Sequence, residues 1–171
     1  MGRLYVCPLA RVEQVVAQTG AGSLVSLLNP PLEPPRLAFI APERRLRLNV
    51  SDIVAPVDGH VLAGADHVEA LLAFLRRWDR AAPMVVHCYA GVSRSPAAAY
   101  IAACALTNAP EAEIAQNLRR ISPSATPNRH MIALADSLLS RQGRMIAAIE
   151  SIGRGTDCFE GEVFFMDMAR N

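Results

Sequence analysis

The chain has 171 residues, of which 51% are hydrophobic and 19% are charged, and its formal net charge is +1. This composition is typical of a folded protein with its own apolar core, and the length favours one domain over residues 1–171. A charge so close to zero gives no bulk attraction to nucleic acid or to an acidic membrane surface, so neither is an expected partner. Any anion must therefore be bound by a local site.

The N-terminus and the cysteines predict a reduced, cytoplasmic protein, which we also expect to be a monomer. Met1–Pro8 lacks the long apolar stretch of a signal peptide. The longest apolar run, about Pro96–Leu106, is far shorter than the ~18 residues that suggest a membrane span. The cysteines show neither CxxC spacing nor a disulfide framework; they are Cys7, Cys88, Cys104 and Cys158.

The first third of the chain alternates predicted strands with one short helix. A helix is expected over Arg11–Gln18, closed by two glycines, and Pro30–Pro35 reads as a surface loop. Apolar and β-branched runs predict strands at four places, which are Leu4–Val6, Ser23–Leu28, Leu37–Ile40 and Leu46–Val50.

A loop over Ser51–Gly64 then leads into an amphipathic helix. Asp66 can cap this helix, and apolar residues follow it at helical spacing, namely Val68, Leu71, Leu72, Leu75 and Trp78. After Pro83, Met84–Val86 is predicted to be a buried central strand.

The last part of the chain is predicted to be mostly helical. Ala97–Leu106 is apolar all round, so this helix should be buried. Two more helices are expected after Pro110 and Pro127, and a further one from about Arg144 to Ile152. Val163–Met166 fits either a strand or a packing arm. The order of elements predicts an α/β domain with a central, mostly parallel sheet flanked by helices, and a ligand loop between a central strand and a buried helix.

That ligand loop spans His87–Pro96 and reads His-Cys-Tyr-Ala-Gly-Val-Ser-Arg-Ser-Pro. Its backbone N–H groups can curl around an anion, and the following helix directs its positive end to the same place. Arg94 lies far enough along the loop to return beside Cys88 and hold two oxygens with its planar fork. We therefore predict a phosphate site formed by Cys88 to Arg94, including Tyr89, Ala90, Gly91, Val92 and Ser93.

The same positive field favours a thiolate on Cys88, which predicts a nucleophile that forms a phosphocysteine intermediate. Gly91 sits in mid-loop, where a positive φ is expected. Ser95 can donate a hydrogen bond to the sulfur and ease its departure in a second step. His87 is expected to hydrogen-bond the loop backbone and hold its shape.

This loop resembles the HCxxGxSRSP signature of the protein tyrosine phosphatases, and of their dual-specificity branch in particular. Leu118-Arg119-Arg120 followed by Pro127-Asn128 is similar to the R…PN segment of that branch, and Ser26–Pro30 also fits. The resemblance covers residues 4–140. Residues 141–171, a helix and a tail, depart from it and receive no role.

The resemblance implies a general acid, an Asp some thirty-odd residues before the cysteine. Asp52 and Asp58 both lie in that interval, and we favour Asp52 because it directly follows a predicted strand. Asp58 precedes a glycine, which also fits an ordinary turn. For Asn128, the resemblance implies a role in ordering the active-site loops, whereas its position also fits first-turn helix chemistry.

Together these features predict a phosphomonoester hydrolase of the protein tyrosine or dual-specificity type, acting without a cofactor on a phosphorylated protein or a small phosphomonoester. No metal is expected, because the histidines outside the loop are scattered. The variable loop residues Tyr89, Ala90 and Val92 are not basic, which argues against lipid head groups and RNA 5′ ends. A catalytically silent phosphate-binding module and a rhodanese-type sulfurtransferase remain as alternatives.

Overall fold

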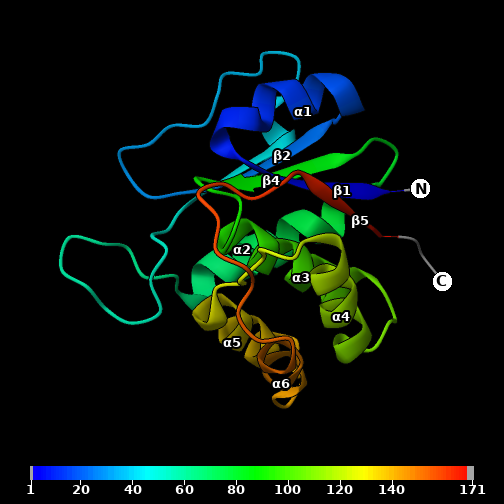
Figure 1. Ribbon diagram of the computed structural model, residues 1–171. Helices are drawn as coiled ribbons and strands as arrows, with labels where there is room; N and C mark the ends of the chain where they lie inside the picture. The colour runs from blue at the N-terminus through cyan, green and yellow to red at the C-terminus, as the bar shows by residue number, and fades with distance from the viewer. Residues whose placement is uncertain (1, 169–171) are drawn as a thin grey trace.

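The computed structural model describes residues 2–168, which form a five-stranded sheet with helices on both faces (Figure 1). The strand order is β3-β2-β4-β1-β5, and every neighbouring pair is parallel except β1 and β5. The predicted α/β fold with a mostly parallel sheet is confirmed. The strands are β1 (Arg3–Pro8), β2 (Ser23–Leu28), β3 (Arg45–Asn49), β4 (Met84–Cys88) and β5 (Phe164–Asp167).

The helices divide unequally between the two faces of the sheet. Helix α1 (Val12–Thr19) lies on one face, and the later helices lie on the other (Figure 1). Two short 3-10 helices span Leu9–Arg11 and Pro42–Arg44. The helices of the crowded face are α2 (Ala65–Arg77), α3 (Arg94–Leu106), α4 (Glu111–Ile121), α5 (Arg129–Leu138) and α6 (Arg144–Ser151). No helix within residues 2–168 has the length and apolar character needed to cross a membrane.

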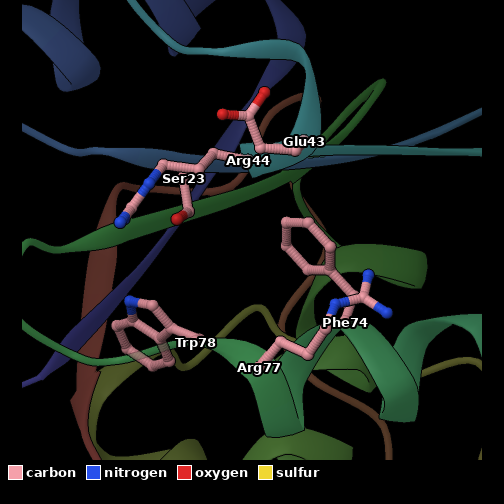
Figure 2. A pocket seen from close by; sticks show the side chains of 6 residues that line it. All are labelled: Ser23, Glu43, Arg44, Phe74, Arg77 and Trp78. Atoms are coloured by element: carbon pink, nitrogen blue, oxygen red, sulfur yellow. The ribbon is translucent and has the colours of Figure 1, made fainter.

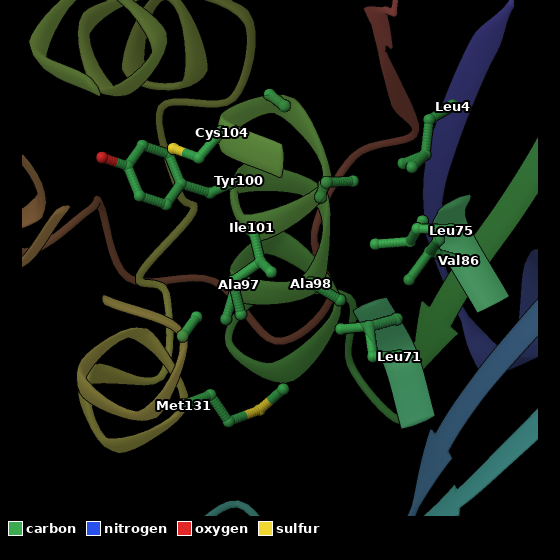
Figure 3. Packing of buried hydrophobic residues seen from close by; sticks show 14 of the residues in the cluster. Leu4, Leu71, Leu75, Val86, Ala97, Ala98, Tyr100, Ile101, Cys104 and Met131 are labelled. Atoms are coloured by element: carbon green, nitrogen blue, oxygen red, sulfur yellow. The ribbon is translucent and has the colours of Figure 1, made fainter. Parts of the chain in front are cut away.

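The alternation of side chains along each strand divides the core into two parts. In β4, Met84 and Val86 join the large core beneath α2 and α3, whereas Val85 joins the smaller core beneath α1. Helix α3 lies inside the large core, as its apolar composition predicts: Ala98 points toward Leu71 of α2, and Ala97 lies on the side of α5 (Figure 3). Its small side chains let neighbouring elements approach closely, so α3 holds the Cys88 loop against a rigid core.

Two local predictions are wrong. Leu37–Ile40 forms a turn and not a strand, because its two end residues are buried as anchors in the small core instead of pairing with a neighbouring strand. Asp66 does not cap α2; the helix begins at Ala65 and the Asp66 side chain is 82% exposed. The Gly64 N–H instead donates to His67 Nδ1 at 3.0 Å, which satisfies a donor at the start of the helix.

The C-terminal segment, which had no predicted role, closes the sheet and touches the Cys88 loop. Strand β5 pairs with β1, in agreement with the strand alternative for Val163–Met166. Between α6 and β5 the chain runs past the carboxyl end of the sheet (Figure 1), where the Gly161 N–H donates to the Ala90 carbonyl at 2.9 Å. Residues 154–167 are therefore part of the framework around the loop.

Candidate active site

The Cys88 loop lies between the carboxyl end of β4 and the first turn of α3, and its carbonyls are fixed from outside. Separate segments of the chain donate to the loop carbonyls at 2.8–3.2 Å; the pairs are Leu9 with Tyr89, Gly161 with Ala90, Thr126 with Val92, and Asn128 with Ser93. In a trans peptide the N–H points opposite to the C=O. Anchoring these carbonyls outward therefore turns the following N–H groups toward the inside of the loop, where they can bind an anion.

Gly91 has a backbone conformation and surroundings that require glycine. Its φ is +72°, as the sequence predicts, and a Cβ at this position would lie 2.8 Å from the Pro8 nitrogen. Gly161 packs from the other side, where a Cβ would lie 2.8 Å from the Gly91 oxygen. The top of the loop is thus confined between the end of β1 and the C-terminal segment.

Cys88 is buried at the base of this loop, and a backbone N–H and a hydroxyl approach its sulfur. The Gly91 N–H donates to Sγ at 3.3 Å, and Ser95 Oγ lies 3.1 Å from Sγ. Ser95 stands in the first turn of α3, so the positive end of the helix dipole acts on the same atom. The sulfur thus lies where a backbone N–H, a hydroxyl and the start of α3 converge.

Arg94 is only 5% exposed and presents an unsatisfied donor. Its Nη1 donates to the Val50 carbonyl at 2.9 Å and approaches Asn29 Oδ1 at 3.4 Å. The buried Nε has no partner within residues 2–168. A buried guanidinium N–H is costly to leave unpaired, so this edge of the fork fits an anion that completes its hydrogen bonds.

Sequence reasoning missed Asn29 and Val50, although a signal for both was present. They follow β2 and β3, which lie beside β4 in the parallel sheet. Residues after the carboxyl ends of neighbouring parallel strands meet at one edge of the sheet, where ligands bind in such folds. Asn29 directly follows one predicted strand and Val50 ends another, so their positions pointed to the edge that holds Arg94.

The structure brings Asp52 to the loop and leaves Asp58 apart from it. Ser93 Oγ donates to Asp52 Oδ1 at 2.7 Å, and Asn128 Nδ2 donates to the same oxygen at 2.9 Å. Asn128 Oδ1 also accepts from the Met131 N–H, so this residue both caps α5 and contacts the loop that carries Asp52. Asp58 lies in an exposed turn, without a side-chain hydrogen bond to residues 2–168.

Comparisons with known proteins give structural relatives only. No family model and no curated protein sequence matches the chain. Solved structures do match it. Cydia pomonella PTP-2 phosphatase has a TM-score of 0.62 and 22% identity, covering 78% of this chain and 84% of its own. Human DUSP28 has a TM-score of 0.61 and 22% sequence identity, and the match covers 81% of this chain and 89% of the DUSP28 chain. DUSP15 has a TM-score of 0.61 and 17% sequence identity, and the match covers 88% of this chain and 96% of the DUSP15 chain. The chain has the fold of the dual-specificity and protein tyrosine phosphatases.

Within this phosphatase fold, His87 supports the loop from the α1 side of the sheet. Its Nε2 pairs with Ser26 Oγ at 2.7 Å, and its Nδ1 lies 3.4 Å from the Cys88 carbonyl. The ring is completely buried. Burial, assisted by the nearby positive charge of Arg94, lowers the pKa of His87 from 6.5 to about 4, so the ring is neutral at physiological pH.

The buried His87 should make the stability of this phosphatase fold depend on pH. Because the folded pKa is below the unfolded one, the unfolded chain binds more protons below pH 6.5, and stability falls as the pH drops toward 4. We expect a loss of about 2 kcal/mol between about pH 7.5 and about pH 5, measured by urea unfolding. His87→Asn should remove this pH-dependent loss of stability. The control His60→Asn, at an exposed site, should retain it. An equal pH dependence in both variants would contradict the assignment.

Two further buried cysteines stay protonated, and the cavity beside the end of α2 lies away from this site. Cys7 and Cys104 are buried, and burial raises the pKa of each thiol to about 12, so both stay protonated. A cavity of about 300 Å³ opens near the amino ends of β2 and β3, at the opposite end of the strands from Cys88. Figure 2 shows its lining, which includes Phe74 and Trp78 from the end of α2.

Proposed function

We propose that this protein is a phosphomonoester hydrolase of the protein tyrosine or dual-specificity type. The observation that carries the proposal is the buried Nε of Arg94, which has no partner within residues 2–168 and lies in a loop whose carbonyls are anchored from outside and whose Gly91 N–H points at the Cys88 sulfur. A doubly charged phosphoryl group satisfies both at once, because it accepts hydrogen bonds from the amides and from the guanidinium fork. The shared fold of solved phosphatases supports the same function.

The reaction has two steps, and each uses groups that lie around the loop. In the first step, the Cys88 thiolate attacks phosphorus, the bond to the leaving oxygen breaks, and Asp52 gives that oxygen a proton. In the second step, Asp52 takes a proton from water, the water oxygen attacks the phosphocysteine, and the sulfur leaves as a thiolate. Ser95, 3.1 Å from the sulfur, stabilises the departing charge. Arg94 and the loop amides bind the phosphoryl oxygens throughout.

The proposed substrates are a phosphorylated protein or a small phosphomonoester. The loop presents Tyr89, which is 54% exposed, and Ala90 and Val92 beside it, and none of these is basic. A substrate with several phosphates would meet no additional positive charge from these side chains. Because a catalytic thiol must stay reduced, we place the enzyme in the cytoplasm.

The test of the function is hydrolysis of p-nitrophenyl phosphate by the purified protein in buffer containing EDTA. Turnover under these conditions supports the proposed reaction. Tight binding of inorganic phosphate without turnover would favour a silent phosphate-binding module. Transfer of sulfur from thiosulfate to cyanide faster than phosphate release would favour a rhodanese-type activity instead.

The two aspartates should differ sharply in their effects on phenyl phosphate hydrolysis. Asp52→Asn is expected to reduce kcat by ~10²–10⁴-fold, because the variant cannot give a proton to a poor leaving group. Asp58→Asn is the matched control and should keep wild-type turnover, since Asp58 lies in an exposed turn. Steady-state kinetics of the two variants decide which aspartate is the general acid. A larger loss of kcat in Asp58→Asn would reassign the role to Asp58.

A further inference from the structure

We infer that Ser93 acts through its side chain as a positioning residue for the proton donor, and that Oδ2 of Asp52 is the oxygen that carries the transferred proton. This inference rests on the proposed function and assigns a role to a residue that the sequence placed only in the phosphate loop. It concerns the side chain of Ser93 alone, because the backbone of the loop still faces the phosphate.

The hydrogen bonds around Asp52 distinguish its two carboxyl oxygens. Ser93 Oγ and Asn128 Nδ2 both donate to Oδ1, at 2.7 and 2.9 Å. Oδ2 has no hydrogen bond to residues 2–168. An oxygen that accepts two hydrogen bonds is poorly disposed to carry a proton as well. The proton of a neutral Asp52 therefore sits on Oδ2, the oxygen left free for a leaving group.

Ser93 is well placed to orient this carboxyl because its backbone is held on both sides. Its carbonyl accepts from the Ala97 N–H of α3 at 3.0 Å and from the Asn128 N–H at 3.2 Å. The start of α3, the start of α5 and the acid loop thus form one connected unit around Asp52. Asp52 follows Ser51, which pairs with Val61 across the base of the acid loop.

The same geometry excludes the Ser93 hydroxyl from binding phosphate while it holds Asp52. A hydroxyl has a single proton to donate, and at 2.7 Å that proton is engaged by Asp52 Oδ1. The hydroxyl therefore contributes to catalysis by fixing the acid relative to Cys88. Its loss should slow the first step, phosphocysteine formation, mainly where the leaving group depends on proton donation.

The test is the dependence of kcat/KM on the leaving group in Ser93→Ala, because kcat/KM reports phosphocysteine formation and is independent of the second step. With phenyl phosphate, whose leaving group needs a proton, we expect kcat/KM to fall on the order of 10-fold, the effect of losing one hydrogen bond to a charged group. With p-nitrophenyl phosphate, whose leaving group departs readily as an anion, we expect a clearly smaller loss of kcat/KM. The dissociation constant for inorganic phosphate should stay close to the wild-type value, since Arg94 and the loop N–H groups are unchanged. Ser93→Thr keeps the hydroxyl and should restore kcat/KM on phenyl phosphate.

A double-mutant cycle tests whether the effect passes through Asp52. In the Asp52→Asn background, Ser93→Ala should cause no further loss with phenyl phosphate, because the proton donor is already absent. An equal loss for both substrates, a weakened affinity for phosphate, or a full additional loss in the Asp52→Asn background would each overturn the inference. A wild-type protein without phosphatase turnover would instead contradict the proposed function itself, so the two failures are distinguishable.

Discussion

Replacing Cys88 with serine is expected to reduce hydrolysis of aryl phosphates by at least roughly 10⁴-fold, because a serine hydroxyl in this loop is a far weaker nucleophile than a thiolate. The loop amides and Arg94 remain in the variant, so it should still bind inorganic phosphate. A discontinuous assay at high protein concentration measures the residual rate, and calorimetry measures the binding.

The exposed Cys158 provides the matched control for this substitution. Cys158→Ser changes the same side chain at a position without a role in the loop and should keep wild-type turnover. Residual activity of Cys88→Ser within tenfold of wild type would contradict a phosphocysteine intermediate. If phosphate binding persists, the same variant can retain phosphorylated molecules from a cell extract, and the bound species would identify the substrate class.

The second large effect is expected for Arg94→Lys, which keeps the positive charge and removes the planar fork. Arg94 uses Nη1 to hold the Val50 carbonyl, and its Nε has no partner among residues 2–168 and can bind a ligand. A single ammonium group cannot reproduce both contacts in the same geometry. We expect kcat to fall by ~10²–10³-fold, as for the loss of an oriented donor to a charged transition state.

Arg76→Lys is the control for this change, because Arg76 lies on the exposed side of α2 and should tolerate the substitution. The measurement is kcat and KM with p-nitrophenyl phosphate, together with the unfolding midpoint of each variant. Turnover of Arg94→Lys close to the wild-type value would show that charge alone suffices at this position, and it would remove the bidentate contact from the proposed mechanism.

Helices were predicted well because their signals lie within a few neighbouring turns. The spacing of Val68, Leu71 and Leu75 predicts α2, and all three are buried in the large core. Leu37–Ile40 has the composition of a strand, yet a strand forms only where a partner lies beside it; here Leu37 and Ile40 are buried against α1 without one. The C-terminal segment carried no strong local signal, and its place was set by pairing with β1.

The sequence by itself determined the proposed chemistry of the Cys88 loop, since the sulfur, the amides, Arg94 and Ser95 all belong to one short segment with fixed spacing. Only the tertiary structure decided how Asp52, the proposed proton donor, is held. Ser93 and Asn128 lie 41 and 76 residues from Asp52 along the chain, and they meet it because parallel strands and the starts of two helices converge at one edge of the sheet. Such contacts depend on how distant elements pack, and no spacing within a single segment encodes them.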